Sequence, residues 1–456
     1  MRSYLILGAA ALVAASPAPQ GFDFAAVDAV QAPAQGPPVG PGPAEDVSYN
    51  QGEAQGQAAA AAAAPASAQL AKKSAGADLE ARTFWWLNPK PVQPNPGYPV
   101  VTPAPTPTTT AAPTYNPTST NTAPDGCTPV SWTNTWAFTA DPACPTAIEV
   151  GTYCGFINPL DPCAAQPNAY GPPTVPDTVD AFKSNTVYSD LAKNAKTPTG
   201  YAQAFSNLQG SVEGSGYLSY KLLTSYDPAA CAAYCDETKT CTGFNIFIER
   251  DPKFNQEQCS CQASSITQFK CSIWGQEVKK EAATNKGGNQ GGFEVVVVGS
   301  NGYNKATYTP PTLPPSCSKP QDCGHKLHNQ QPYCIGQKTF PGPFDPTLCY
   351  AYAAKQNIVN KKAGWINLVM SMFGMNKSAC VQFQAAYIEK AGHGVGTHCR
   401  LFTKKFSSFQ ANLDISVGGS ANFGCQKSFT WDLDVNASFD FNWKRDLNET
   451  LAINFE

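Results

Sequence analysis

The 17 cysteines are the strongest constraint on how this chain can fold. All of them lie from Cys127 onward, so the first quarter of the chain contains none. Three of them fall within the eleven residues of "CAAYCDETKTC", from Cys231 to Cys241. Such a group can belong to a zinc site, to a redox site or to a disulfide framework.

A disulfide framework fits these cysteines best. Zinc would need four soft ligands, and no histidine precedes His325. A thioredoxin-like site would need two residues between its cysteines and a βαβ context, and neither is present. The N-terminal sequence "MRSYLILGAAALVAAS" indicates a secretory signal peptide over residues 1–15, and the secretory route is oxidising. We therefore expect a secreted protein, located in the extracellular region or the cell wall.

Residues 16–126 differ in composition from the rest of the chain. They hold an unbroken alanine run over 58–64 and the Thr/Pro-rich stretch "VVTPAPTPTTTAAPTYNPTSTNTAP". A low-complexity segment of this kind buries too little apolar surface to offset the entropy of ordering it. We expect a long disordered Ala/Pro/Thr-rich stalk, in which Lys72-Lys73 is either a processing site or a solvated pair.

The residues around Cys231 predict a helix laid on an antiparallel sheet, which is an α+β fold. Asp227-Pro228 is a strong helix start, because Asp caps the helix and Pro suits its first position. The alternation in "GFNIFIER" predicts a strand that is buried on one face only. A second strand begins near Lys270, and a third, apolar strand ends at an Asn301-Gly302 turn.

The cysteine spacing resembles that of the PAN/apple module family. Its pattern is Cys-x3-Cys on a helix, five residues, Cys-x2-Phe opening a strand, and a later Cys-x-aliphatic. The residues at those positions are Cys231, Cys235, Cys241, Phe244, Cys271 and Ile273. The resemblance implies the disulfides Cys231–Cys271 and Cys235–Cys241, worth roughly 4 and roughly 2 kcal/mol by loop closure.

More narrowly, "YLSYKLLTSYDPAACAAYCD", "FNIFIERDP" and "GSNGYNK" are similar to secreted fungal proteins with tandem apple-like modules. This likeness covers roughly residues 165 to 430. The family resemblance implies binding of protein or carbohydrate, without choosing between them.

A second, altered copy follows the first. "FDPTLC" echoes "YDPAAC", "CVQFQAAYIEK" echoes "CTGFNIFIER", and "HCRLF" echoes "KCSIW". Cys349–Cys399 therefore corresponds to Cys231–Cys271, whereas Ala353 replaces the second helix cysteine. Cys380 loses that partner and either stays free or pairs with one of Cys317, Cys323, Cys334 and Cys425.

These features predict four parts after the stalk: a cysteine-containing loop-rich segment over 127–200, a first apple-like module over 201–306, an altered second module over 317–430, and a C-terminal tail over 431–456. The pairing of the remaining cysteines stays open, namely Cys127, Cys144, Cys154, Cys163, Cys259 and Cys261.

No catalytic or cofactor-binding motif stands out. The four histidines are expected to be ordinary loop and strand residues rather than metal ligands, and no nucleophile elbow or His-Glu-x-x-His helix occurs. Neither a basic stripe nor a membrane-length apolar run is present, so we expect no nucleic acid and no membrane span. We predict a non-catalytic protein without cofactor or metal.

The expected function is binding of an extracellular or cell-wall glycan or of a surface protein. A structural wall protein without a discrete ligand is the alternative, and an uncharacterised hydrolase is a distant third. Sequons predict N-glycosylation at Asn376, Asn436 and Asn448. An exposed indole is the usual platform for a sugar, so the candidate contacts are Trp274, Trp365 and Trp431, although core packing is favoured for Trp274.

Overall fold

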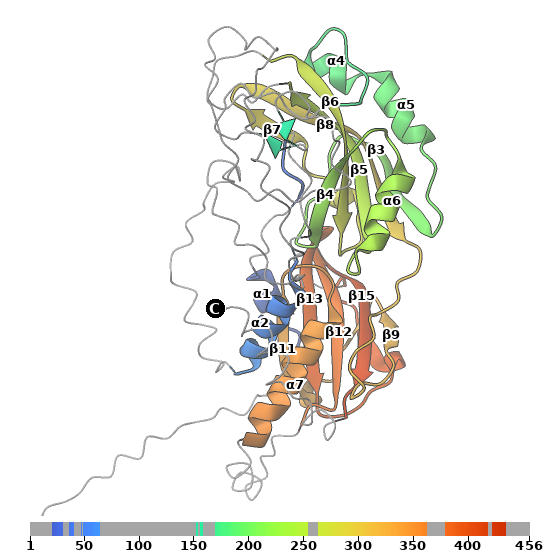
Figure 1. The fold of residues 1–456 in the computed structure, drawn as a ribbon. Coiled ribbons are helices and arrows are strands. Elements are labelled where there is room, and N and C mark those ends of the chain that lie inside the picture. Colours follow the sequence, from blue (N-terminus) through green and yellow to red (C-terminus); the bar gives the residue numbers. More distant parts are fainter. Residues whose placement is uncertain are drawn as a thin grey trace, which may run out of the picture.

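The computed structural model describes residues 21–30, 36–40, 47, 49–63, 152–153, 156–157, 169–253, 263–362, 379–417 and 422–434. Most of them form two α+β units that lie end to end (Figure 1). We call residues 169–306 the first unit and residues 316–434 the second unit. The secretory signal, the lysine pair and six of the cysteines named above (Cys127, Cys144, Cys154, Cys163, Cys259 and Cys261) lie outside the described residues.

The first unit is built on an antiparallel sheet with strand order β3-β8-β5-β6-β4. The short strand β7 pairs with the N-terminal end of β8, from Phe293 to Val296. At the centre of the sheet, Ile246 of β5 is paired with Cys271 of β6. The bounds are β3 Tyr201–Leu208, β4 Tyr217–Leu223, β5 Gly243–Pro252, β6 Ser265–Trp274, β7 Gly287–Gln290 and β8 Phe293–Lys305.

The second unit repeats this topology. Its sheet has strand order β9-β15-β12-β13-β11, all antiparallel, which matches the first sheet strand for strand except for β7. The bounds are β9 Gln321–Gly324, β11 Cys334–Phe340, β12 Gln382–Lys390, β13 His393–Phe402 and β15 Phe423–Asp432, with a separate pair β10 Leu327–His328 and β14 Ala411–Leu413. The internal repeat read from short sequence echoes is therefore a repeat of a whole folding unit.

One helix crosses the same face of each sheet, and its start is the one that the sequence predicts. Helix α6 (Pro228–Glu237) is capped by Asp227, whose side chain accepts a bond from the Ala229 amide at 2.8 Å. Helix α7 (Pro346–Lys362) begins after Asp345, which accepts the Thr347 amide at 2.9 Å. In both cases Asp supplies an acceptor and Pro lacks the amide that would need one.

Three cysteine pairs lie at disulfide distance: Cys231–Cys271, Cys235–Cys241 and Cys349–Cys399. Their Cα–Cα separations are 5.6, 5.4 and 5.1 Å, within the range that a disulfide requires. All six residues lie in the cores between helix and sheet. The pairs are those that the resemblance and the repeat implied.

The first unit begins earlier than expected. Within the segment predicted to be loop-rich, helices α4 (Val179–Lys183) and α5 (Thr186–Asn194) pack on β8, and Phe182 and Tyr188 are buried in the first core. The expected Asn301-Gly302 turn is also absent, because β8 continues through both residues. The Asn301 side chain donates to the Ala192 carbonyl at 2.7 Å and accepts the Asn207 amide at 2.8 Å.

The described parts of the N-terminal region are folded, contrary to the prediction of a disordered stalk there. Helix α1 (Phe24–Asp28) lies against β11, and residues 36–40 lie on the first sheet. Helix α2 (Gln51–Ala63) contains most of the alanine run and packs along α7, with Ala58 fully buried (Figure 1). Alanine has the highest helix propensity and its small side chain allows close helix packing, so low complexity did not prevent burial here.

Candidate functional site on the open face of the first sheet

The face of the first sheet that points away from α6 is buried and carries charged side chains beside aromatic ones such as Phe247 and Trp274; we call it the open face. Strand β5 is buried at every position, whereas the sequence predicted burial on one face only. Phe244, Ile246 and Ile248 form the apolar core below α6. The alternate residues, among them Glu249 and Asp251, point to the open face and are nevertheless buried.

Lys270 of β6 is the centre of this face. Its ammonium group donates to Glu249 Oε1 at 2.5 Å, to the Pro38 carbonyl at 3.0 Å and to the Gly40 carbonyl at 2.5 Å. An ammonium has three protons, so its bonding capacity is filled by one carboxylate and two main-chain carbonyls. The ring of Tyr220 lies 5.5 Å from the same nitrogen.

Glu249 completes the contact from the neighbouring strand. Its Oε1 also accepts the Gly40 amide at 2.8 Å. Both charged side chains are almost fully excluded from solvent, at 0% for Lys270 and 1% for Glu249. A buried pair of this kind contributes little net stability compared with apolar residues of similar size, but removing one partner costs about 3–5 kcal/mol.

Asp251 lies two residues beyond Glu249 on the same face. Burial, followed by the negative charge of Glu249, raises the pKa of the Asp251 carboxyl well above its ordinary value. Asp251 therefore holds its proton more tightly than a free aspartic acid does. Burial disfavours the charged form of this carboxyl, and the adjacent Glu249 carboxylate adds to the shift.

The segment 36–40, "GPPVG", is held almost entirely through its main chain. Besides the bonds to Lys270 and Glu249, Gln290 of β7 donates to the Val39 carbonyl at 2.7 Å. Gly40 has φ of 91°, and a Cβ placed on it would lie 2.0 Å from Gln290 Nε2. Glycine is thus the residue that fits this position without strain.

The corresponding face of the second sheet is also polar and buried, and it also contains one buried cation. Arg400 of β13 donates to the His328 carbonyl at 2.7 Å. Burial and the nearby Arg400 charge lower the pKa of His398 to about 3, and mainly burial lowers the pKa of His328 to about 4. Both imidazoles are neutral at physiological pH, and the ring of Phe22 packs on His398 at 4.9 Å.

The other two histidines bond to main-chain carbonyls, His325 to Cys425 and His393 to Glu213. Within the part of the chain that the structure describes, no group of three metal-binding side chains occurs.

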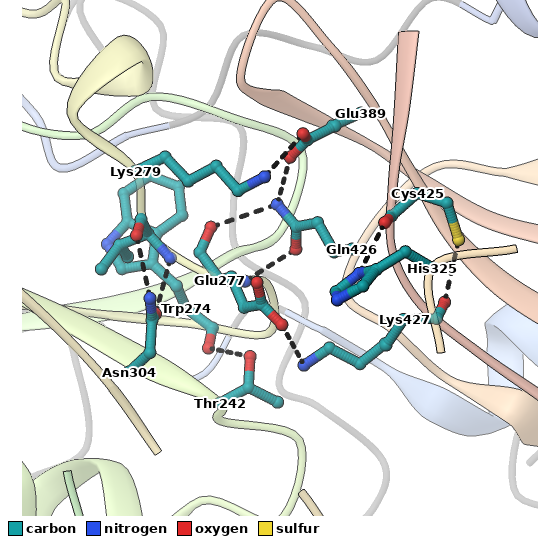
Figure 2. A network of polar contacts seen from close by, with 11 residues as sticks. Thr242, Trp274, Glu277, Lys279, Asn304, His325, Glu389, Cys425, Gln426 and Lys427 are labelled. Carbon is teal, nitrogen blue, oxygen red and sulfur yellow. Dashed lines mark hydrogen bonds and ion pairs between the residues drawn. The ribbon is translucent and has the colours of Figure 1, made fainter. Parts of the chain in front are cut away.

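The two units are joined by a polar network between the loop after β6 and strands β12 and β15. The Gln426 amide both accepts from the Glu277 amide at 2.8 Å and donates to the Glu277 carbonyl at 3.3 Å. Figure 2 shows these contacts together with the ion pairs Lys279–Glu389 at 2.6 Å and Lys427–Glu277 at 3.5 Å. The side-chain amide of Gln426 thereby bonds to both main-chain polar groups of one residue, Glu277.

The indoles predicted as sugar contacts do not offer a surface. Trp274 and Trp431 are both 0% exposed. The Trp274 Nε1 donates to Ser272 at 3.1 Å, and the ring of Trp431 stacks on Phe383 at 5.5 Å. Neither residue is the glycan contact that the sequence suggested as a candidate, because each lies on a strand whose two faces are both covered. Core packing, the interpretation favoured for Trp274, is confirmed. Trp365 and the sequons at Asn376, Asn436 and Asn448 lie outside the described residues.

Cys380 stays a free thiol in the structure. Its Sγ lies 3.2 Å from the Gln382 carbonyl, and burial raises its pKa to about 12. A thiol with such a pKa is protonated and poorly reactive at neutral pH. The described residues hold five free cysteines, all in the second unit: Cys317, Cys323, Cys334, Cys380 and Cys425.

The sequence contained a signal for the Lys270 site that the strand pattern concealed. "IERDP" and "QFKCS" each place charged residues inside a strand that also carries large apolar residues. The sequence predicts burial of one face of β5 only, which leaves Glu249 on the solvent side, where charged residues usually lie. Only the residues that cover the sheet show that they are buried.

Searches of family models, curated proteins and solved structures found no match to this chain. None of the helices in the described ranges is both long and apolar enough to cross a membrane.

Proposed function

We propose that this chain is a secreted, glycosylated, non-catalytic protein with two apple-like units, and that it binds an extended polypeptide segment of a protein partner on the open face of the first unit. The observation that carries the proposal is the contact of Lys270 and Glu249 with the main chain of residues 38–40. The fungal cell wall or its surroundings is the proposed location.

The chemistry of the open face supports a polypeptide ligand rather than a glycan. Lys270, Glu249 and Gln290 bond to main-chain carbonyls and an amide, which every polypeptide offers. Glycan binding is less well supported, because the two described tryptophans that were candidate sugar contacts, Trp274 and Trp431, are buried. A buried ion pair gains little stability over apolar packing, so a role in recognition is a reason to retain it.

The test is a panel of fluorescent nine-residue peptides of varied composition, measured against the full chain by polarisation, beside pull-down on chitin, β-glucan and mannan. We expect a subset of peptides to bind, with an affinity weakened by residues 38–40, which already lie on this face, and we expect the polysaccharides to leave the protein in the supernatant. The matched variant is Lys270→Met/Glu249→Leu, which removes both charges and leaves neither unpaired, so it should fold but not bind. Peptide binding that survives in this variant, or retention on a polysaccharide alone, would contradict the proposal.

A further inference from the structure

The proposed function leaves open which polypeptide segments fit the open face, and the occupant seen in the structure answers this. We infer that the open face selects extended segments of sequence Pro-Pro-aliphatic-Gly from a protein partner, and that residues 37–40 are an intramolecular occupant that competes with them. This inference rests on the proposed function and adds a sequence requirement to it.

Side chains of two strands bind the three carbonyls of residues 38–40, and a side chain of a third strand binds one amide. Lys270 binds the first and the third carbonyl, Gln290 binds the second, and Glu249 binds the amide of Gly40. These are side-chain contacts rather than strand pairing. An incoming segment therefore does not need to add a strand to the sheet, and four bonds fix its register.

Each position of the segment has a physical reason for its residue type. Proline at 37 and 38 fixes an extended backbone before binding, which lowers the entropy cost, and Pro38 has no amide to leave unpaired. The Val39 side chain lies over β7, with Cγ1 3.4 Å from the Cβ position of Gly288. Any other residue in place of Gly40 must adopt a left-handed φ and displace the Gln290 amide, which then loses its bond to Val39.

Competition follows from covalent attachment. A tethered segment has a local concentration on the order of millimolar for a short flexible connection, so a free segment binds weakly while the tethered one is intact. Weakening the tethered segment without altering the face should therefore reveal the binding of a free one. Gly40→Ala does this, because it changes the occupant and none of Lys270, Glu249 and Gln290.

The experiment measures binding of the peptide AQGPPVGPG, which is residues 34–42, to the full-length chain by isothermal titration calorimetry. We expect Gly40→Ala protein to bind it about tenfold or more tightly than wild type, since the local competitor is weakened. The same peptide carrying Gly40→Ala should bind neither protein measurably. The control protein is Gly200→Ala, whose φ is 82° and whose Cβ would have nothing within 4 Å; it should behave as wild type.

The outcomes separate this inference from the proposed function. If the peptide panel contains binders that depend on Lys270 and Glu249 but AQGPPVGPG is not among them, the function stands and the sequence requirement is wrong. Equal binding of the Gly and Ala peptides overturns the requirement for glycine. A dimer of wild-type or Gly40→Ala chains in light scattering, lost in Lys270→Met/Glu249→Leu, would show that the occupant is a second copy and overturn the separate partner.

Discussion

At the scale of single residues, the open face of the first sheet concentrates the unusual chemistry of this chain. Lys270 and Glu249 form a buried ion pair, and burial raises the pKa of Asp251 beside them well above its ordinary value. The three residues lie on two adjacent strands and share one face of the sheet. The strength of their electrostatic interactions therefore depends on how completely water is excluded from that face. Titration of Asp251 therefore reports directly on that exclusion.

Asp251→Asn should change how stability depends on pH. The raised pKa means that the folded protein keeps a proton which the unfolded chain releases above its ordinary pKa of 3.8, so this residue makes the wild type less stable as pH rises from about 4. Relative to wild type, the variant should gain up to about 1.4 kcal/mol per pH unit above that point. Urea unfolding at pH 4, 5, 6 and 7 measures the difference.

The exposed residue Asp190, changed to Asn, is the control and should run parallel to wild type. If Asp251→Asn also runs parallel to wild type from pH 4 to pH 7, Asp251 is ionised in the folded state and the open face is hydrated.

At the scale of helices and strands, the second unit retains the geometry of a disulfide that its sequence has lost. Cys241 Sγ lies 3.2 Å from the Gly243 carbonyl, and Cys380 Sγ lies at the same distance from the Gln382 carbonyl. Gly243 and Gln382 open the central strands β5 and β12 of the two sheets. Cys380 therefore occupies the position of Cys241, although a longer helix and a longer connection precede it.

Ala353→Cys should restore, in the second unit, the disulfide that corresponds to Cys235–Cys241. Ala353 occupies the helix position of Cys235, and both Ala353 and Cys380 are fully buried in the second core. We expect a disulfide between residue 353 and Cys380 in the secreted variant, with a gain of roughly 3 kcal/mol for a loop of this length. Non-reducing peptide mapping identifies the pair, and denaturant unfolding measures the gain.

Ala354→Cys is the matched control, because the next residue points about 100° around the helix and should remain a thiol. Free thiols at both 353 and 380 would show that the connection to Cys380 places it differently from Cys241.

At the scale of the whole molecule, the two units and the N-terminal segments form one body. Besides the network around Gln426, the Phe344 amide of the second unit bonds to the Gly275 carbonyl of the first at 2.8 Å. The N-terminal region contacts both units: Gly40 on the first sheet, Phe22 on the second, and α2 along α7. Because these contacts join the two units directly and through the N-terminal segments, we expect the units to unfold together.

Gly275→Ala should separate their unfolding. A Cβ at this position would lie 2.2 Å from Pro343 Cβ, so the units must move apart to accept it. We expect wild type to show one calorimetric transition and the variant two, the first at a temperature several degrees lower. Gly292→Ala, which has φ of 95° and nothing within 4 Å of its Cβ, should keep a single transition. Two transitions in wild type would contradict this picture of one cooperative body.

The sequence by itself determined the features that depend on near neighbours. The helix starts at Asp227 and Asp345 and the duplicated unit follow from local caps and repetition, and the cysteine pairs are those implied by the resemblance to the PAN/apple family and by the repeat. Tertiary structure alone decided what covers each sheet. Lys270 and Glu249 are buried because residues more than 200 positions away lie across them, and an alanine-rich stretch without amphipathic pattern is a packed helix because α7 accepts its small side chains. Whether a residue is buried depends on residues that are distant along the chain, and the composition of a segment does not identify those residues.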